Sequence, residues 1–178
     1  MSATTIARNY AEALFELGER SGNTDRYAEL LDAVAGAVET TPQVQGVLMS
    51  PRVPKAEKIR LFGAALKSAP REFVLFLQAL LKRGRQRLLR EISTEYQALL
   101  DIKHNRIRAG VTLARPADPA LQREIQEALS RELGKEVIAA FHADPEILGG
   151  TVVRIGERIH DGSVRRRMTK LRRHLLSG

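Results

Sequence analysis

The chain of 178 residues contains no cysteine and no tryptophan, and aromatic residues make up only 4% of it. Without cysteine there is no disulfide framework, no thiolate catalysis and no cysteine-ligated zinc or iron–sulfur site. With so few aromatic residues, the core has to consist mainly of Leu, Ile, Val and Ala, which favours packed helices over an aromatic-rich β-sandwich. The longest strongly apolar run, residues 73–81, is far shorter than the roughly 20 residues that span a bilayer, so we expect no direct membrane insertion.

Sequence motifs of the common enzyme and cofactor sites are also missing. There is no phosphate-binding P-loop, no GxGxxG, no GxSxG, no HExxH and no EF-hand loop. The histidines are isolated from one another at His104, His142, His160 and His174. His142 and Asp144 have the spacing to share a metal ion, but a turn aspartate beside an exposed histidine is the commoner explanation. We therefore predict a protein that is not an enzyme, with no catalytic residues, no cofactor and no metal site.

Basic residues outnumber acidic ones by 29 to 21, which gives a formal net charge of +8. Residues 163–178 hold six basic residues and no acidic one. This cluster fits equally well an electrostatic docking site for acidic or phosphate groups and a solvated helix face whose cations suit a helix C-terminus. A second cluster surrounds Gly84 and consists of Lys82, Arg83, Arg85, Arg87 and Arg90. We interpret this second cluster as a solvated loop.

Up to about residue 105 the hydrophobic pattern has the period of helices. One helix begins near residue 5 and ends near Gly18, a second covers about 25–40, and residues 43–54 are expected to form a loop with at most a short helical turn at 44–49. Pro54 and Pro70 suit the first turns of a third and a fourth helix, and Gly84 suits the end of the fourth. With a fifth helix over about 86–104, the sequence predicts an N-terminal five- or six-helix bundle in residues 1–105.

The hydrophobic period changes in residues 106–178. Apolar alternation over 107–113 predicts a half-buried strand, and Asp118 and Pro119 suit the N-cap and the first residue of a helix. The alternation returns over 137–141 and again over 153–155, and a final helix is expected after Asp161, Gly162 and Ser163. The predicted fold is mainly α, with the helical bundle followed by a small α+β domain of order strand–helix–strand–strand–helix.

A glycine-rich segment of this second part carries a recognisable pattern. A Gly-Gly pair precedes a hydrophobic strand with an arginine and a Gly-acid turn, and Asp-Gly-Ser then precedes a hydrophobic residue, an arginine and a leucine-bearing helix. The residues that match this pattern are Gly149, Gly150, Val153, Arg154, Gly156, Glu157, Ile159, Asp161, Gly162, Ser163, Val164, Arg165 and Leu171. The segment resembles the C-terminal signature of the delta subunit of bacterial ATP synthase, whose mitochondrial counterpart is the oligomycin-sensitivity-conferring protein.

The beginning and the middle of the chain resemble the same family. Residues 6–15 resemble its first helix, in which an Ala-Arg-x-Tyr-Ala-x-Ala core is usual, although Asn9 stands where many members have proline. Residues 80–88, with Gly84 and Arg85, resemble its mid-chain Gly-Arg turn. The resemblance therefore covers the whole chain in length and in the order of its elements.

The resemblance implies a non-catalytic stator subunit of the proton-translocating ATP synthase, present in one copy per complex. It would be a peripheral protein at the cytoplasmic face of the plasma membrane. Its helical domain, residues 1–105, would grip the catalytic head through the amphipathic N-terminal segment of an alpha subunit. Its small domain, residues 106–178, would hold the C-terminal ends of the b subunits in the peripheral stalk, so that the head does not rotate with the rotor.

For the alpha-subunit segment we predict that a helix binds in a groove beside the first and fourth helices. Alanines on the first helix leave room for an incoming apolar face. The predicted contact residues are Ala7, Tyr10, Ala11, Leu14, Leu75 and Ala79. The alternative is that all six belong to the core, and we expect at least half of them to do so.

For the b subunits we predict a contact near the end of the chain, in which the basic face of the last helix meets acidic ends of the b subunits. The predicted contact residues are Arg154, Val164, Met168 and Leu171. The residues interpreted as architecture, and not as contacts, are Gly149, Gly150, Gly156, Asp161, Gly162 and Ser163. Among them Asp161 and Ser163 are expected to cap the last helix, a contribution of about 1 kcal/mol.

A basic helical protein can also bind nucleic acid, and this is the competing class of function. The few aromatic residues offer little base stacking, and none of the known reader motifs is present. Binding to phosphates would weaken steeply with salt, whereas binding in an apolar groove would not. We therefore predict protein partners and no nucleic acid.

Overall fold

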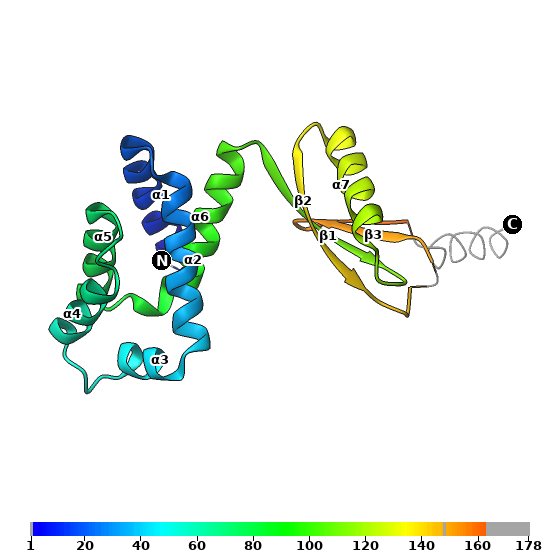
Figure 1. The fold of residues 1–178 in the computed structure, drawn as a ribbon. Helices are drawn as coiled ribbons and strands as arrows, with labels where there is room; N and C mark the ends of the chain where they lie inside the picture. Colours follow the sequence, from blue (N-terminus) through cyan, green and yellow to red (C-terminus); the bar gives the residue numbers. More distant parts are fainter. Residues whose placement is uncertain (1, 148, 163–178) are drawn as a thin grey trace, which may run out of the picture. The chain divides into compact units, whose positions relative to one another are not determined.

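The computed structural model describes residues 2–147 and 149–162. The chain divides into two compact units, residues 1–100 and residues 101–178. The first unit is helical, and the second combines a sheet with a helix (Figure 1). The predicted class, mainly α with a small α+β part after a helical part, is confirmed.

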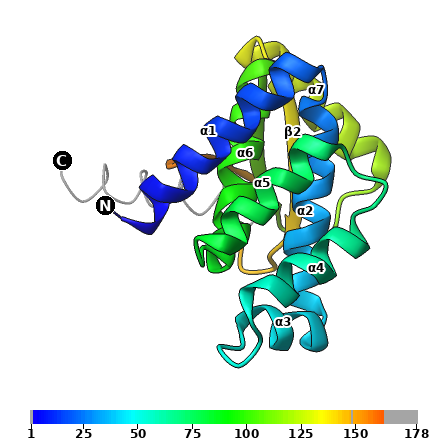
Figure 2. The same cartoon turned by 90° about the vertical axis from the view of Figure 1, so that its left-hand side faces the viewer.

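Six α-helices and one 3-10 turn build the helical part (Figure 2). They are α1 (Ala3–Ser21), α2 (Thr24–Thr40), α3 (Pro42–Met49), α4 (Lys55–Ala65), α5 (Arg71–Lys82), η1 (Gln86–Leu88) and α6 (Leu89–Lys103). Helix α3 is longer than expected, because the sequence indicated a loop with at most a short helical turn over residues 44–49. Pro42 lies in its first turn, where the missing N–H costs no helical hydrogen bond, so the proline begins the helix as well as ending the one before it.

Four aromatic side chains are buried in the core of the helical unit, namely Tyr27, Phe73, Phe76 and Tyr96. The Tyr27 and Phe73 rings lie 5.6 Å apart, and the buried Tyr96 hydroxyl donates a 2.9 Å hydrogen bond to the Thr24 carbonyl oxygen. Burial raises the pKa of the Tyr96 phenol, which therefore stays protonated. Gly18 of α1 packs against Tyr96 and Thr24. A Cβ at this position would lie 3.0 Å from the Tyr96 hydroxyl oxygen and 3.1 Å from Thr24 Cα.

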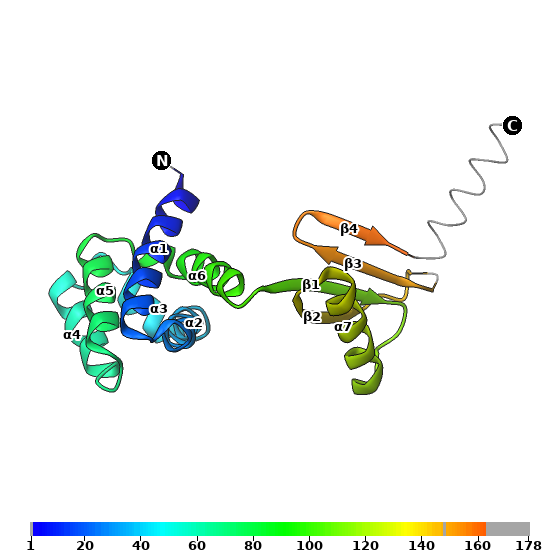
Figure 3. The ribbon, with the colours of Figure 1, turned by 90° about the horizontal axis from the view of Figure 1, so that it is seen from above.

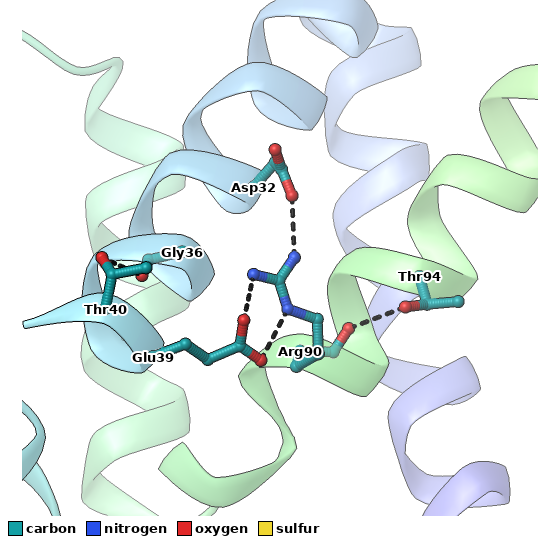
Figure 4. Close-up of polar contacts among 6 residues, drawn as sticks. All are labelled: Asp32, Gly36, Glu39, Thr40, Arg90 and Thr94. Carbon is teal, nitrogen blue, oxygen red and sulfur yellow. Dashed lines mark hydrogen bonds and ion pairs between the residues drawn. The ribbon is translucent and has the colours of Figure 1, made fainter. Parts of the chain in front are cut away.

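An ion-pair cluster joins α2 to α6 (Figure 4). Arg90 donates two hydrogen bonds to the Glu39 carboxylate, at 2.8 and 2.6 Å, and a third to Asp32 at 2.8 Å. These hydrogen bonds hold the pKa of Glu39 below its ordinary value and raise that of Arg90. The cluster fixes the register of two helices that are distant in sequence.

The second unit contains a four-stranded mixed sheet in the order β2-β1-β3-β4 (Figure 3). Its elements are β1 (Arg106–Leu113), α7 (Pro119–Leu133), β2 (Glu136–Ala143), β3 (Thr151–Ile155) and β4 (Arg158–Asp161). Strands β1 and β2 are parallel and joined by α7, whereas β3 and β4 are antiparallel to their neighbours. The Asp118 carboxylate caps α7 as predicted, accepting hydrogen bonds from two backbone N–H groups.

One face of the sheet packs on α7. The buried residues Ala109, Val111, Val137 and Val153 form this core, and the apolar stripe of α7 lies against it. Because strand residues alternate between faces, the even-numbered residues beside them, among them Arg154, lie on the opposite face. Strand β4 was not predicted, because its four residues carry only one large apolar side chain, Ile159, which is half exposed.

The glycines of the end motif form turns in the described part of the chain. Gly149 and Gly150 have φ of 85° and 88° before β3, and Gly156 has φ of 57° between β3 and β4, a region that glycine adopts at little cost. Asp161 ends β4, and the Gly162 N–H donates to the Thr151 carbonyl oxygen at 3.0 Å. Ser163, and the final helix that Asp161 and Ser163 were expected to cap, lie outside the described residues.

The chain passes from α6 to β1 through only two residues, His104 and Asn105. Asn105 adopts a left-handed conformation, with φ of 51°. Arg108 of β1 donates to the mostly buried Asp101 carboxylate at 2.6 Å, so the last turn of α6 is tied to the second unit. This explains why the division falls at Leu100, five residues before the predicted boundary at 105.

Candidate interaction surfaces

Helix α1 presents two adjacent apolar stripes. The residues of the first stripe, Ala7, Ala11, Leu14 and Gly18, are buried in the core. The second stripe, spaced i, i+4 and i+7, contains Ile6, Tyr10 and Ala13, which are only partly covered or exposed. Helix α5 packs beside this second stripe, with the Tyr10 and Phe76 rings edge to face at 6.1 Å.

A hollow of about 570 Å³ lies between α1 and the turn after α5, and we call it the α1–α5 hollow. Its lining residues are Ile6, Asn9, Tyr10, Ala13, Arg83 and Arg85. On α5 itself Leu75 is 51% exposed, and Ala79, one turn later, is exposed as well. Exposed apolar residues beside a hollow are typical of a surface that binds another chain.

The six residues predicted to bind the alpha subunit divide into two groups in the structure. Ala7, Ala11 and Leu14 have no exposed surface, and so belong to the core. Tyr10 is half-buried at the hollow, and Leu75 and Ala79 are exposed on α5. The expectation that at least half are core residues therefore agrees with their burial, and a contact role for the other three stays a prediction.

Sequence reasoning missed the residues of the neighbouring stripe, Ile6 and Ala13, and the two arginines. The signal was present: Ile6, Tyr10 and Ala13 recur at helical spacing, one residue before the core positions. Arg83 and Arg85 were interpreted as parts of a solvated loop. The structure places both in the wall of the α1–α5 hollow.

A second hollow of about 490 Å³, the α2–α4 hollow, is almost entirely apolar. It is lined by Leu30, Ala33, Val34, Ala37, Gln43, Val44, Val47, Leu61, Phe62, Ala65 and Leu66. Among its walls Leu61 is 42% exposed. Three of these residues, Gln43, Val44 and Val47, belong to α3, a stretch for which the sequence indicated mostly a loop, so there was no reason in the sequence to expect this hollow.

The second unit offers a smaller hollow of about 290 Å³ on the sheet face opposite α7. Arg108 and Arg154 stand on it, beside Gly110, Ile138 and Ala140. Of the residues predicted to bind the b subunits, Arg154 is the one that the structure describes, and it is exposed. Val164, Met168 and Leu171 lie outside the described residues.

The described residues contain neither a membrane-spanning helix nor a cluster of metal-ligating side chains. None of the helices in residues 2–147 and 149–162 is long and apolar enough to cross a membrane. Within the same residues, no group of three or more His, Cys, Asp or Glu side chains is arranged to hold a metal ion. His142 and Asp144 accordingly have no third ligand there.

The arrangement of a helical unit followed by a small α+β unit has a counterpart among solved structures. A chain of the Toxoplasma gondii mitochondrial ATP synthase hexamer, determined by cryo-EM, is similar with a TM-score of 0.74 over 96% of this chain and 97% of that chain. The two sequences are only 17% identical, so this likeness shows the fold alone.

Sequence comparison then identifies the family. Residues 6–175 match the family described as ATP synthase delta (OSCP) subunit. The ATP synthase subunit delta of Gemmatimonas aurantiaca is 40% identical over 172 residues, covering 96% of this chain and 93% of the relative. That of Desulforamulus reducens is 33% identical over 173 residues, covering 97% and 96%. The chain belongs to the ATP synthase delta (OSCP) subunit family, and the resemblance seen in the sequence is confirmed.

Proposed function

We propose that this chain is a non-catalytic stator subunit that clamps the catalytic head of the ATP synthase to its peripheral stalk. The helical unit binds the N-terminal segment of an alpha subunit, and the sheet unit binds the C-terminal ends of the b subunits. One copy per complex, held at the cytoplasmic face of the plasma membrane by these partners, then keeps the head from rotating with the rotor.

The observation that carries the head contact is the apolar surface made by the wall of the α1–α5 hollow and the exposed side of α5. Half-buried Tyr10 and exposed Leu75 and Ala79 offer an apolar strip that an amphipathic helix can cover. Ala7, Ala11 and Leu14 are buried in the core and hold α1 in place, so that Tyr10 keeps its position on the surface. The residues of the strip therefore lie on helices that are packed on the core.

A clamp has to bind two partners at once. Two modest contacts on one chain reinforce each other only when the connection between them allows both to form. The chain offers a two-residue passage from α6 to β1 with no flexible Gly/Ser linker. This supports a role in which force passes through the chain.

The head contact is tested by calorimetric titration of the full chain with a peptide of about 20 residues from the N-terminus of the same organism's alpha subunit. We expect saturable one-to-one binding that persists at moderate salt. Ala79→Arg should weaken it at least about tenfold, because a charged side chain then occupies the apolar strip. Ala65→Arg, at an exposed alanine of the α2–α4 hollow, is the matched control. Absence of binding to the folded parent chain would reject the proposed head contact.

The stalk contact is tested with a peptide that covers the C-terminal end of the b polypeptide. Arg154 stands on the open sheet face, so Arg154→Glu should weaken binding about tenfold if that end is acidic. Arg131→Glu makes the same charge change on α7, which covers the other face. Equal binding by the two variants would remove Arg154 from the contact.

A further inference from the structure

The turn after α5 brings two arginines together at one end of the α1–α5 hollow. Gly84 is left-handed, with φ of 68°. The Gly84 N–H donates to Leu81 O at 3.0 Å, and the Arg85 N–H donates to Leu80 O at 3.0 Å. This pair of hydrogen bonds is the Schellman ending of a helix, which reverses the chain direction around the glycine. Arg83 lines the hollow from the end of α5, and the reversal after it places Arg85 on the same hollow.

Arg83 also continues the exposed strip of α5. Leu75, Ala79 and Arg83 are spaced i, i+4 and i+8, so they lie on one side of the helix. The strip therefore begins with an apolar residue and ends with a cation. From Leu75 to Arg83 is about 12 Å along the axis at the rise of an α-helix.

The two guanidinium groups have no acidic partner among the described residues. Neither Arg83 nor Arg85 takes part in an ion pair among the residues that the structure describes. On α1, Glu12 is paired with Arg8 of the same helix, at 2.9 Å. The remaining polar wall of the hollow is Asn9, which carries no charge. Two like charges without a counter-ion form a site for a carboxylate, which guanidinium groups bind with two parallel hydrogen bonds.

We infer that Arg83 and Arg85 form a subsite for an acidic side chain of the helix that docks on the α1–α5 hollow. The inference rests on the proposed function and adds the chemistry of the partner. The docked helix lays apolar residues on Tyr10, Leu75 and Ala79, and carries a Glu or Asp about two turns away from the residue on Leu75. The acidic residue fixes the direction and register of the partner, because only one end of the hollow is basic.

The test uses the full chain and two peptides. One is the peptide from the N-terminus of the alpha subunit, and the other is the same peptide with every Glu and Asp replaced by Gln and Asn. The double variant Arg83→Glu, Arg85→Glu is compared with Arg87→Glu, which changes the charge of the same turn at an exposed residue outside the hollow. Circular dichroism of each variant confirms that the helices are retained.

We expect the double variant to bind the acidic peptide at least about thirtyfold more weakly than the parent, and Arg87→Glu to stay within about threefold. The neutral peptide should bind the parent weakly, and a peptide with Lys at the acidic position should recover affinity for the double variant. Equal affinity of the parent for the acidic and neutral peptides would overturn the subsite, as would equal binding by the double variant and Arg87→Glu.

The failure of the subsite can be distinguished from the failure of the head contact. If the parent binds and only Ala79→Arg weakens binding, the subsite alone fails. If the parent binds neither peptide, the proposed head contact fails, and the subsite with it.

Discussion

The helical unit carries two hollows of similar volume, about 570 and 490 Å³, whose walls differ in chemistry. The α2–α4 hollow is lined almost entirely by apolar side chains, whereas the α1–α5 hollow has apolar walls and two arginines at one end. An apolar surface provides binding free energy but little preference for one orientation. Unpaired charges at one end of the hollow favour one orientation of the bound partner. The α1–α5 hollow is therefore better suited to hold one partner in one register, which a stator contact requires.

The largest expected effect separates the two hollows by matched substitutions. Leu75 and Leu61 are both exposed leucines, at 51% and 42%. Leu61 lines the α2–α4 hollow, and Leu75 lies on α5, the helix that ends at the arginines of the α1–α5 hollow. Leu75→Asp should weaken binding of the alpha-subunit peptide about a hundredfold, since a carboxylate would replace the largest exposed apolar side chain of α5. Leu61→Asp should leave the affinity unchanged in the same titration. The reverse pattern would move the head contact to the α2–α4 hollow.

The two hollows also differ in how tightly their supporting helices are packed. Gly18 of α1 has no room for a Cβ, whereas a Cβ on Gly46 of α3 meets nothing within 4 Å. Gly18→Ala should lower the free energy of unfolding by about 1–3 kcal/mol, because α1 has to move from Tyr96 and Thr24.

Urea unfolding of Gly46→Ala provides the contrasting control. This variant should be more stable than the parent by about 0.5–1 kcal/mol, since alanine loses less backbone entropy in a helix. If both alanine variants changed stability in the same direction, the packing difference between α1 and α3 would be wrong.

A smaller effect concerns the ion pairs that hold α2, one wall of the apolar hollow, to α6. Arg90→Gln should lower the free energy of unfolding by about 0.5–1 kcal/mol at neutral pH, the scale of a partly exposed ion pair. Arg60→Gln, which breaks a pair within α4 alone, should cost less.

The pH dependence of the Arg90 contribution follows from Glu39. Because Arg90 lowers the pKa of Glu39 in the folded state, this contribution is fully present above the ordinary glutamate pKa of 4.5 and is lost as the pH falls through the lowered value. The stability difference between the parent and Arg90→Gln should therefore shrink when unfolding is measured in acid. A difference that stays constant from pH 7 to strongly acidic solution would contradict the role of the carboxylate.

Much of the helical unit follows from local sequence signals. Pro54, Pro70 and Gly84 stand at helix ends whose backbone they suit, so α4 and α5 were predicted close to their observed bounds. Helix α3 was expected only as a possible short turn over residues 44–49, because eight residues between two proline-containing turns show too little periodicity. Strand β4 was missed for a related reason: its pairing with β3 comes from the turn at Gly156, not from its own hydrophobic pattern.

The interaction surface was predictable only in part. Periodicity shows that α1 has apolar residues on two adjacent stripes, but both stripes fit a core equally well. Which stripe is buried depends on where α2, α5 and α6 pack, and these are contacts between residues distant in sequence. Leu14 therefore looked like a contact residue and is core, whereas Ile6 and Ala13 border the hollow. The position of Arg85 depends on the left-handed conformation of Gly84. The sequence predicts that the helix ends at this glycine, but not the direction in which the chain leaves it.

The most direct test of the head contact uses the absence of cysteine from the chain, because a single introduced cysteine is then the only thiol. Ala79→Cys places it on the exposed side of α5, and Ala65→Cys places it at an exposed alanine that lines the α2–α4 hollow. Each variant is mixed with the alpha-subunit peptide carrying an activated disulfide on one apolar residue, and the cross-linked fraction is measured by mass. We predict rapid cross-linking at residue 79, competed by unlabelled peptide, and only background cross-linking at residue 65. Competed cross-linking at residue 65 with background at residue 79 would contradict the assignment.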